Sequence, residues 1–330
     1  MRIGFVYDLR DDYLAEGFTA EEVVEFDTRE TLGHIEGSLI RLGHEVERVG
    51  RGQQLARRLA QGQRWDMVFS IAEGLQGRSR EAQVPAVLEL FDQPYLFSDP
   101  LTMALTLDKS MAKRVVASAG IPTAPWRVVA SPDEIDAIDL EMPLFVKPLW
   151  EGTGKGCDVN SLVRERKALP GVIRAKLERY RQPVLVETFL SGREFTVGFI
   201  GNVPDVHVLG VMEIVLNARA DAEVYTMTNK ELSESRVDYH RADDAVGEQV
   251  VALGRAAFAA LGCRDVARLD FRCDARGNPY FLEANPLPGM HRTHSDLPII
   301  AGLMKVTYDE LMAMIVTAGC QRLSIPQQPG

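Results

Sequence analysis

Two segments with alternating side chains, residues 266–273 and 279–285, constrain the fold more than any other feature of the sequence. Successive strand residues face opposite sides, so one face of each segment is polar and the other apolar. The apolar face carries Leu269, Phe271, Leu282 and Ala284. A face this apolar must be buried, so we predict an antiparallel hairpin that closes at Arg276-Gly277.

The polar face of this hairpin brings metal-ligand side chains together. In the predicted register Asp270 lies opposite Glu283, and Arg268 lies opposite Asn285. Two facing carboxylates repel each other unless a cation lies between them. Carboxylate and amide oxygens are hard ligands that suit Mg²⁺ shared with substrate phosphates. We therefore predict a metal site at Asp270, Glu283 and Asn285; the alternative is a solvated face whose acids are accidental.

The rest of the chain divides into segments of different type. Over the first ~100 residues short apolar strands alternate with helices, which is typical of an α/β domain with a parallel sheet. A second unit begins near residue 102, and a third unit that starts with antiparallel strands follows it. We predict an α/β chain, α+β overall, with three domains at residues 1–101, 102–185 and 186–330.

Composition excludes several classes of function. The 47 acidic residues outnumber the 37 basic ones and no basic tract occurs, which argues against nucleic acid or a membrane surface as a partner. The four cysteines are scattered, as reduced thiols are. The first residues contain no signal-peptide pattern, and no apolar run approaches the ~20 residues of a membrane span. We expect a cytoplasmic protein that acts on small molecules.

Two further segments suggest a nucleotide. Lys147 ends an apolar strand and precedes a loop, residues 151–156, whose three glycines let backbone N–H groups approach phosphate oxygens. The loop is not a Walker A motif, and in isolation it could equally be a surface turn. Glu187 and Glu194 could accept hydrogen bonds from an adenine amine and ribose hydroxyls, although isolated glutamates are usually solvated.

In this order the motifs resemble the ATP-grasp superfamily, and most closely its D-alanine–D-alanine ligase branch. The resemblance extends across roughly residues 66–320. The matching segments are residues 98–110, 145–148, 151–153, 186–187, 194–197, 268–270, 282–290 and 305–311. It implies an ATP-grasp fold with three domains, in which a Rossmann-like parallel sheet at the N-terminus is followed by two ATP-grasp subdomains.

The resemblance also implies a role for each matching residue, with ATP and two Mg²⁺ (or Mn²⁺) ions as cofactors. Residues that would contact ATP are Lys109, Lys147, Glu151, Gly152, Thr153, Glu187, Phe189, Leu190, Glu194 and Lys230. Arg268 and the backbone N–H of Gly289 would stabilise a tetrahedral oxyanion, and Lys230 would reach the γ-phosphate. Thr153 and Ser295 would contact the first amino-acid substrate.

The implied activity is ADP-forming carbon–nitrogen ligation. A carboxylate would become an acyl phosphate that an amine then attacks. This intermediate hydrolyses readily, so water must be excluded, and the long polar segment 217–239 is a candidate lid for that purpose. Three alternatives stay open beside a ligase of altered specificity: a true D-alanine–D-alanine ligase of peptidoglycan synthesis, a non-catalytic nucleotide-binding regulator, and a phosphotransferase with a non-amine acceptor. The resemblance also implies a homodimer.

Departures from the family lie on the side that selects the substrates. The N-terminal Gly-Gly-x-Ser-x-Glu motif is missing, and Glu16 is the one candidate for the glutamate that orients the substrate amine. Glu73-Gly74 replaces a His-Gly segment. Extra cations that would suit a more anionic acceptor, if they are not simply surface charges, are Arg78, Arg80 and Lys155.

Overall fold

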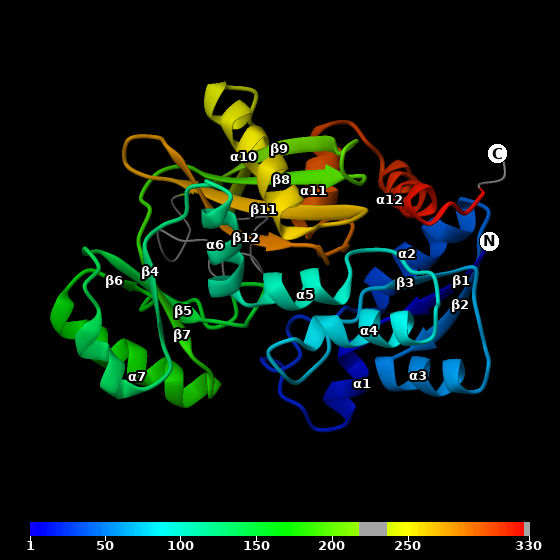
Figure 1. The fold of residues 1–330 in the computed structure, drawn as a ribbon, viewed down its shortest axis with the longest axis horizontal. Coiled ribbons are helices and arrows are strands. Elements are labelled where there is room, and N and C mark those ends of the chain that lie inside the picture. Colours follow the sequence, from blue (N-terminus) through cyan, green and yellow to red (C-terminus); the bar gives the residue numbers. More distant parts are fainter. Residues whose placement is uncertain (218–235, 327–330) are drawn as a thin grey trace.

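A computed structural model describes residues 1–217 and 236–326, and these residues form three β-sheets. Figure 1 shows the sheets as three parts of the molecule, with the C-terminal sheet above and between the other two. Lys230 and nearly all of the predicted lid lie outside the described residues, so their predicted roles stay predictions. No helix within the described part of the chain has the length and apolar character needed to cross a membrane.

The N-terminal sheet is parallel, as the alternation of strands and helices predicts. Its strands, in spatial order, are β2 (Glu45–Gly50), β1 (Arg2–Val6) and β3 (Met67–Ser70). The helices around it are α1 (Arg10–Ala15), α2 (Arg29–Arg41), α3 (Gly52–Ala60) and α4 (Gln83–Leu90). All four residues of β3 are buried, because helices cover both faces of a parallel sheet.

The central sheet is antiparallel, and the helix α7 (Leu169–Tyr180) packs against it. Its strands, in spatial order, are β4 (Trp126–Val129), β7 (Val184–Thr188), β5 (Leu144–Pro148) and β6 (Leu162–Val163). Two helices, α5 (Pro100–Leu107) and α6 (Lys109–Ser118), precede it. The predicted domain boundary at 185/186 falls inside β7, which pairs with β5 along its whole length. We therefore propose that this boundary follows Thr188.

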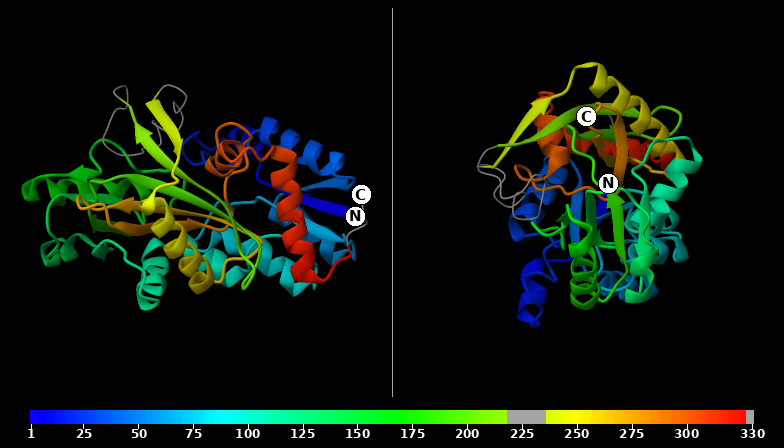
Figure 2. Two further views of the ribbon diagram at one scale, coloured as in Figure 1. Left: turned by 90° about the horizontal axis from the view of Figure 1, so that it is seen from above. Right: turned by 90° about the vertical axis from the view of Figure 1, so that its left-hand side faces the viewer.

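The C-terminal sheet has five antiparallel strands and is covered by helices on both faces (Figure 2). Its strands, in spatial order, are β10 (Val237–Arg241), β9 (His207–Leu216), β8 (Glu194–Ile200), β11 (Val266–Cys273) and β12 (Pro279–Asn285). The covering helices are α10 (Ala245–Leu261) and α11 (Asp296–Leu303). Side chains on alternate positions of β8 pack with α10, which is the burial pattern expected for a strand between two layers.

The hairpin of β11 and β12 has the predicted register at its functional end. Asp270 lies opposite Glu283, and Arg268 lies opposite Asn285. The register then shifts, because a bulge between Asp270 and Phe271 sets Phe271 opposite Phe281. The prediction that Leu282 shares the buried face is therefore wrong: Leu282 lines a pocket on the same side as Glu283.

The last helix, α12 (Tyr308–Leu323), returns to the N-terminal domain (Figures 1 and 2), where the sulfur of Cys320 lies 3.8 Å from that of Met1. It packs against α2, where Asp309 accepts hydrogen bonds from Ser38 and from both ends of the Arg41 guanidinium. Buried residues of the two helices share one core with the N-terminal sheet. The C-terminal part of the chain thereby fixes the first and third sheets relative to each other.

Candidate active site

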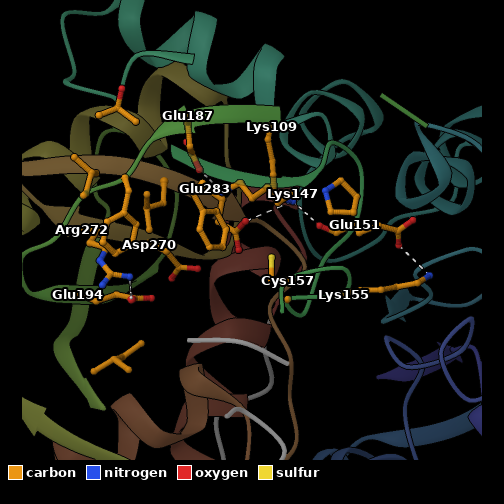
Figure 3. Close-up of a pocket in the computed structure, with 18 of the residues that line it drawn as sticks. Lys109, Lys147, Glu151, Lys155, Cys157, Glu187, Glu194, Asp270, Arg272 and Glu283 are labelled. Carbon is orange, nitrogen blue, oxygen red and sulfur yellow. Dashed lines mark hydrogen bonds and ion pairs between the residues drawn. The ribbon is translucent and has the colours of Figure 1, made fainter. Parts of the chain in front are cut away.

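Two adjoining cavities lie where the three sheets meet. The first, drawn in Figure 3, has about 920 Å³ of space between the central and C-terminal sheets. The second, of about 1770 Å³, extends from there to the N-terminal domain. Lys109, Glu283 and Asp296 line both cavities, so the two cavities adjoin at these residues, and we refer to them together as the cleft.

The structure brings nearly all described site residues predicted from the sequence into this cleft. Those that line the first cavity are Lys109, Lys147, Glu151, Glu187, Phe189, Leu190, Glu194, Asp270 and Glu283. Those that line the second are Lys109, Gly152, Thr153, Arg268, Glu283, Asn285, Gly289 and Ser295. Most predicted ATP contacts thus line the first cavity, whereas the predicted oxyanion and substrate contacts line the second, together with the predicted ATP contacts Gly152 and Thr153.

A buried charge triad forms one wall of the first cavity. Glu187 on β7 is 4% exposed and accepts from Lys113 at 2.8 Å and from Lys147 at 2.7 Å. Burial alone would raise the pKa of Glu187, but the two ammonium groups lower it to about 2. Burial lowers the pKa of Lys113, whereas Glu187 and Glu283 outweigh burial and raise the pKa of Lys147. Lys113 was not predicted, because its partner is distant in sequence.

The glycine-rich loop bends over the cleft through backbone hydrogen bonds from Lys155 N to Gly152 O and from Cys157 N to Gly154 O. Thr153, Gly154 and Gly156 have positive φ, and a Cβ at Gly156 would lie 2.4 Å from Pro148. Only glycine fits so close an approach. Lys109 donates to the carbonyl of Glu151, which ties the loop to α6.

The far end of the first cavity combines apolar and polar side chains. Phe189, Leu190 and Leu282 supply the apolar surface, and Arg272 lies over the Phe189 ring. Arg272 also forms an ion pair of 3.1 Å with Glu194 (Figure 3). Apolar walls beside a few placed polar groups are typical of a site for a flat heterocycle such as adenine. Arg272 was not predicted, although it lies two positions after Asp270 on β11. Leu282 was assigned to the buried face, because the bulge in β11 is not visible in the sequence.

The predicted metal ligands meet where the two cavities join. Asp270 accepts hydrogen bonds from Arg268, from Thr196 at 2.6 Å and from the amide nitrogen of Asn285 at 3.2 Å. That orientation of Asn285 leaves its carbonyl oxygen free of Asp270. Glu283 lies 3.5 Å from Lys109. The donor set of two carboxylates and an amide oxygen fits Mg²⁺.

The described residues contain no cluster of three His, Cys, Asp or Glu side chains suited to hold a metal ion. Two carboxylates alone leave most coordination positions to water or to a substrate. This composition is typical of Mg²⁺ sites that are completed by substrate phosphates.

Beyond the metal ligands, Arg268 is held rigidly at the entrance of the second cavity. It is 8% exposed and forms ion pairs with Asp270 at 2.8 Å and with Asp296 at 2.9 Å. Burial opposes its charge, but these carboxylates raise the pKa of Arg268 further, so it stays a cation. Gly289 and Ser295 face the same cavity and are so close that a Cβ at Gly289 would lie 2.7 Å from Ser295 Oγ.

An ion pair at the N-terminal wall of the second cavity joins Glu25, which the sequence analysis did not single out, to Arg80, which it named only as an extra cation. Glu25 and Arg80 form an ion pair of 2.8 Å with both side chains less than 10% exposed. Glu25 also accepts from the backbone N–H of Gly152 at 2.5 Å, and Arg80 donates to the carbonyl of Trp150. This pair therefore fastens the glycine-rich loop to the N-terminal domain. The acidic composition of residues 11–30 was the only available signal.

The structure does not support Glu16 as the substrate-orienting glutamate. Its side chain is 52% exposed and pairs with Arg51 at 2.8 Å, and it lines neither cavity. The acids from this region that do line the cleft are Glu25 and Asp27, and Glu25 also accepts a hydrogen bond from the glycine-rich loop.

The fold and the site together define an ATP-grasp enzyme. A cleft between two antiparallel sheets holds paired lysines, a glycine-rich loop and facing carboxylates, and it continues past a buried arginine into a second cavity. The family model described as "D-ala D-ala ligase C-terminus" matches residues 115–317. The chain belongs to the D-alanine–D-alanine ligase family.

Relatives and solved structures agree with this assignment. A D-alanine–D-alanine ligase of Citrifermentans bemidjiense is 31% identical over 94% of this chain and 96% of its own length. An uncharacterized protein, y4sG, of Sinorhizobium fredii is 33% identical over 78% of this chain and 75% of its own. Two crystal structures of the D-alanine–D-alanine ligase from Bacillus anthracis, one of them complexed with ATP, superpose on this chain with a TM-score of 0.75. Each superposition covers 98% of this chain and 99% of the ligase chain, and the sequence identity is 22%. The predictions of an ATP-grasp fold and of an ATP-dependent ligase are confirmed at the level of the family.

Proposed function

We propose that this protein is an ATP- and Mg²⁺-dependent ligase that joins a carboxylate to the amine of an amino-acid-like substrate through an acyl phosphate. One observation carries the proposal. The cavity with the predicted ATP contacts opens into a second cavity at the facing carboxylates Asp270 and Glu283, beside the buried Arg268. A phosphoryl donor and a carboxylate acceptor could therefore meet at this junction.

Each group in the first cavity has a distinct task in this mechanism. Glu187, held between two lysines, would accept from the adenine amine, and Glu194 from the ribose. Lys147 and the backbone of the glycine-rich loop would bind the phosphates. Asp270, Glu283 and Asn285 would hold Mg²⁺, which neutralises phosphate charge when bound.

The second cavity would carry out bond formation. The substrate carboxylate attacks the γ-phosphorus, and ADP leaves. The second substrate's amine, in its neutral form, then attacks the acyl carbon, and expulsion of phosphate completes the amide. Arg268 and the N–H of Gly289 would stabilise the oxyanion of the tetrahedral intermediate, an effect worth roughly 3–4 kcal/mol per donor in other enzymes.

The proposal includes a specificity that differs from D-alanyl-D-alanine synthesis, because the N-terminal wall of the second cavity differs from the family pattern. Glu25, which is paired with Arg80, lines this wall, and so does Glu73, which stands where the family has histidine. A homodimer stays a prediction that light scattering of the purified protein would test.

The test is ADP release by the purified protein with Mg-ATP, against D-alanine and a panel of L- and D-amino acids and small carboxylic acids, with product mass measured in parallel. We expect ADP and a condensed product in equal amounts for at least one pair. ADP without condensed product would support a phosphotransferase instead. Tight ATP binding without ADP from any pair would support a non-catalytic regulator.

A further inference from the structure

The second cavity has an electrostatic character that the sequence alone did not reveal. Three cations were expected to favour an anionic acceptor, but each of them is paired with a carboxylate of the protein. Arg78 pairs with Asp108 at 3.2 Å, Arg80 with Glu25 at 2.8 Å, and Lys155 with Glu151 at 3.0 Å. The expectation of an anionic acceptor is therefore not supported by the structure.

Acidic side chains of the same cavity are left without such partners. Asp27, Glu73 and Glu81 all line the second cavity. Within residues 1–217 and 236–326, none of these three carboxylates has an ion pair within 4 Å or a side-chain hydrogen bond. Arg10 lines the same cavity as Asp27. Its guanidinium donates hydrogen bonds to the backbone carbonyls of Val24 and Phe26 and not to the Asp27 carboxylate.

These carboxylates interact with one another across the cavity wall. Burial raises the pKa of Glu73 well above its ordinary value, and the neighbouring carboxylates of Glu81 and Glu25 raise it further. Burial likewise raises the pKa of Glu81 and of Asp27 to about 7 each, against the opposing effect of nearby arginines. Without a ligand these raised pKa values favour the protonated carboxyl groups, because the lining carboxylates outnumber the lysine and arginine side chains of the cavity. A cationic ligand would favour their charged forms.

A ligand of matching charge would relieve this repulsion. The cavity adjoins the metal carboxylates and Arg268, so it is the position where the proposed reaction places its amino-acid-like substrates. The α-ammonium of such a substrate offsets one negative charge. Three carboxylates without an ion pair are more than one α-ammonium group can neutralise. This excess favours a substrate with a second cationic group.

We propose that the second cavity selects a substrate with an additional ammonium group, such as a diamino acid, through Asp27, Glu73 and Glu81. This inference rests on the proposed ligase function and names the substrate class of the same site. A side-chain ammonium among these carboxylates would form charge-assisted hydrogen bonds that an apolar side chain of equal size cannot form.

The experiment compares ornithine with norleucine, because the two side chains have equal length and differ in the terminal ammonium and methyl groups. Each is supplied as the L- and the D-isomer with the carboxylic and amino-acid partners of the panel, and ADP release and product mass are measured. We expect kcat/KM to be at least tenfold higher with ornithine. Equal or higher kcat/KM with norleucine would overturn the inference.

Charge-removing variants locate the selectivity. Glu73→Gln and Glu81→Gln should each reduce the preference for ornithine over norleucine at least threefold, with the KM for ATP unchanged. Glu178→Gln, at an exposed position of α7, is the matched control and should keep the preference. An unchanged preference in both cavity variants would overturn the assignment. Asp27→Asn provides a third test if either glutamine variant fails to fold.

A binding measurement separates this inference from the ligase proposal. Thermal unfolding is followed with Mg²⁺ and a non-hydrolysable ATP analogue, in the presence of ornithine or norleucine. Stabilisation by ornithine alone, without ADP release from any pair, would support the substrate class and refute the ligase. Turnover restricted to neutral pairs would support the ligase and overturn the substrate class.

Discussion

The buried triad of Lys113, Glu187 and Lys147 gives a sharp test of how this cleft is held together. In Glu187→Gln the two ammonium groups lose their counter-charge at positions that are 0% and 8% exposed. The pKa of Glu187 falls from 4.5 to about 2 on folding, which corresponds to about 3 kcal/mol at 1.36 kcal/mol per pKa unit. Loss of one partner of a buried ion pair costs about 3–5 kcal/mol in other proteins. We expect the free energy of unfolding to decrease by about 3 kcal/mol at pH 7.

The loss of unfolding free energy caused by Glu187→Gln should become smaller as the pH falls. Because the pKa of Glu187 is lower in the folded state, its stabilisation is complete above pH 4.5 and is lost as the pH falls toward 2. Urea unfolding of the wild-type protein and of Glu187→Gln at pH 7, 5, 4 and 3 measures this loss, with Glu178→Gln as the exposed control. In the double variant with Lys113→Met the loss should be smaller than the sum of the single losses. A decrease below about 1 kcal/mol at pH 7, or one that is independent of pH, would refute the reasoning.

Three further predictions concern the chemistry of the junction. Glu283→Ala should abolish Mg²⁺-dependent ADP formation without loss of the folded state by circular dichroism; normal turnover would disprove the metal assignment. Arg268→Met should reduce kcat more than tenfold with little change in the KM for ATP, because its proposed role is in the transition state, and an unchanged kcat would place that role elsewhere. Gly289→Ala should raise the KM of the amino-acid substrate several-fold and lower the Tm, because its Cβ would lie 2.7 Å from Ser295 Oγ, and Ser295→Gly in the same chain should restore the Tm; a Tm that is not restored would show that the crowding lies with another neighbour.

The position of the N-terminal wall has a consequence for how the two cavities work together. Glu25 and Arg80 hold both Trp150 and Gly152, so the loop proposed to bind phosphates is fastened to the domain that lines the second cavity. A substrate that moves this wall would also move the loop. Phosphoryl transfer would then depend on occupancy of the second cavity, which would limit ATP hydrolysis without substrate.

The sequence by itself determined the parts of this protein that depend on local periodicity and on spacing. Alternation in residues 266–285 predicted the hairpin and placed Asp270 opposite Glu283, because strand geometry has a fixed period of two. The order of motifs predicted the family and many of the residues that line the first cavity. Both kinds of signal lie within short stretches of chain.

Tertiary structure decided what depends on contacts between distant segments. Glu25 meets Arg80 across 55 residues and Gly152 across 127, so no spacing rule could select it in place of Glu16. The bulge that turns Leu282 into the pocket depends on the pairing of two strands. The charge of the second cavity was likewise hidden, because it is set by which cations already have partners. Pairing is a property of the folded chain, since Coulomb energy depends on distance in space and on burial rather than on position in the sequence.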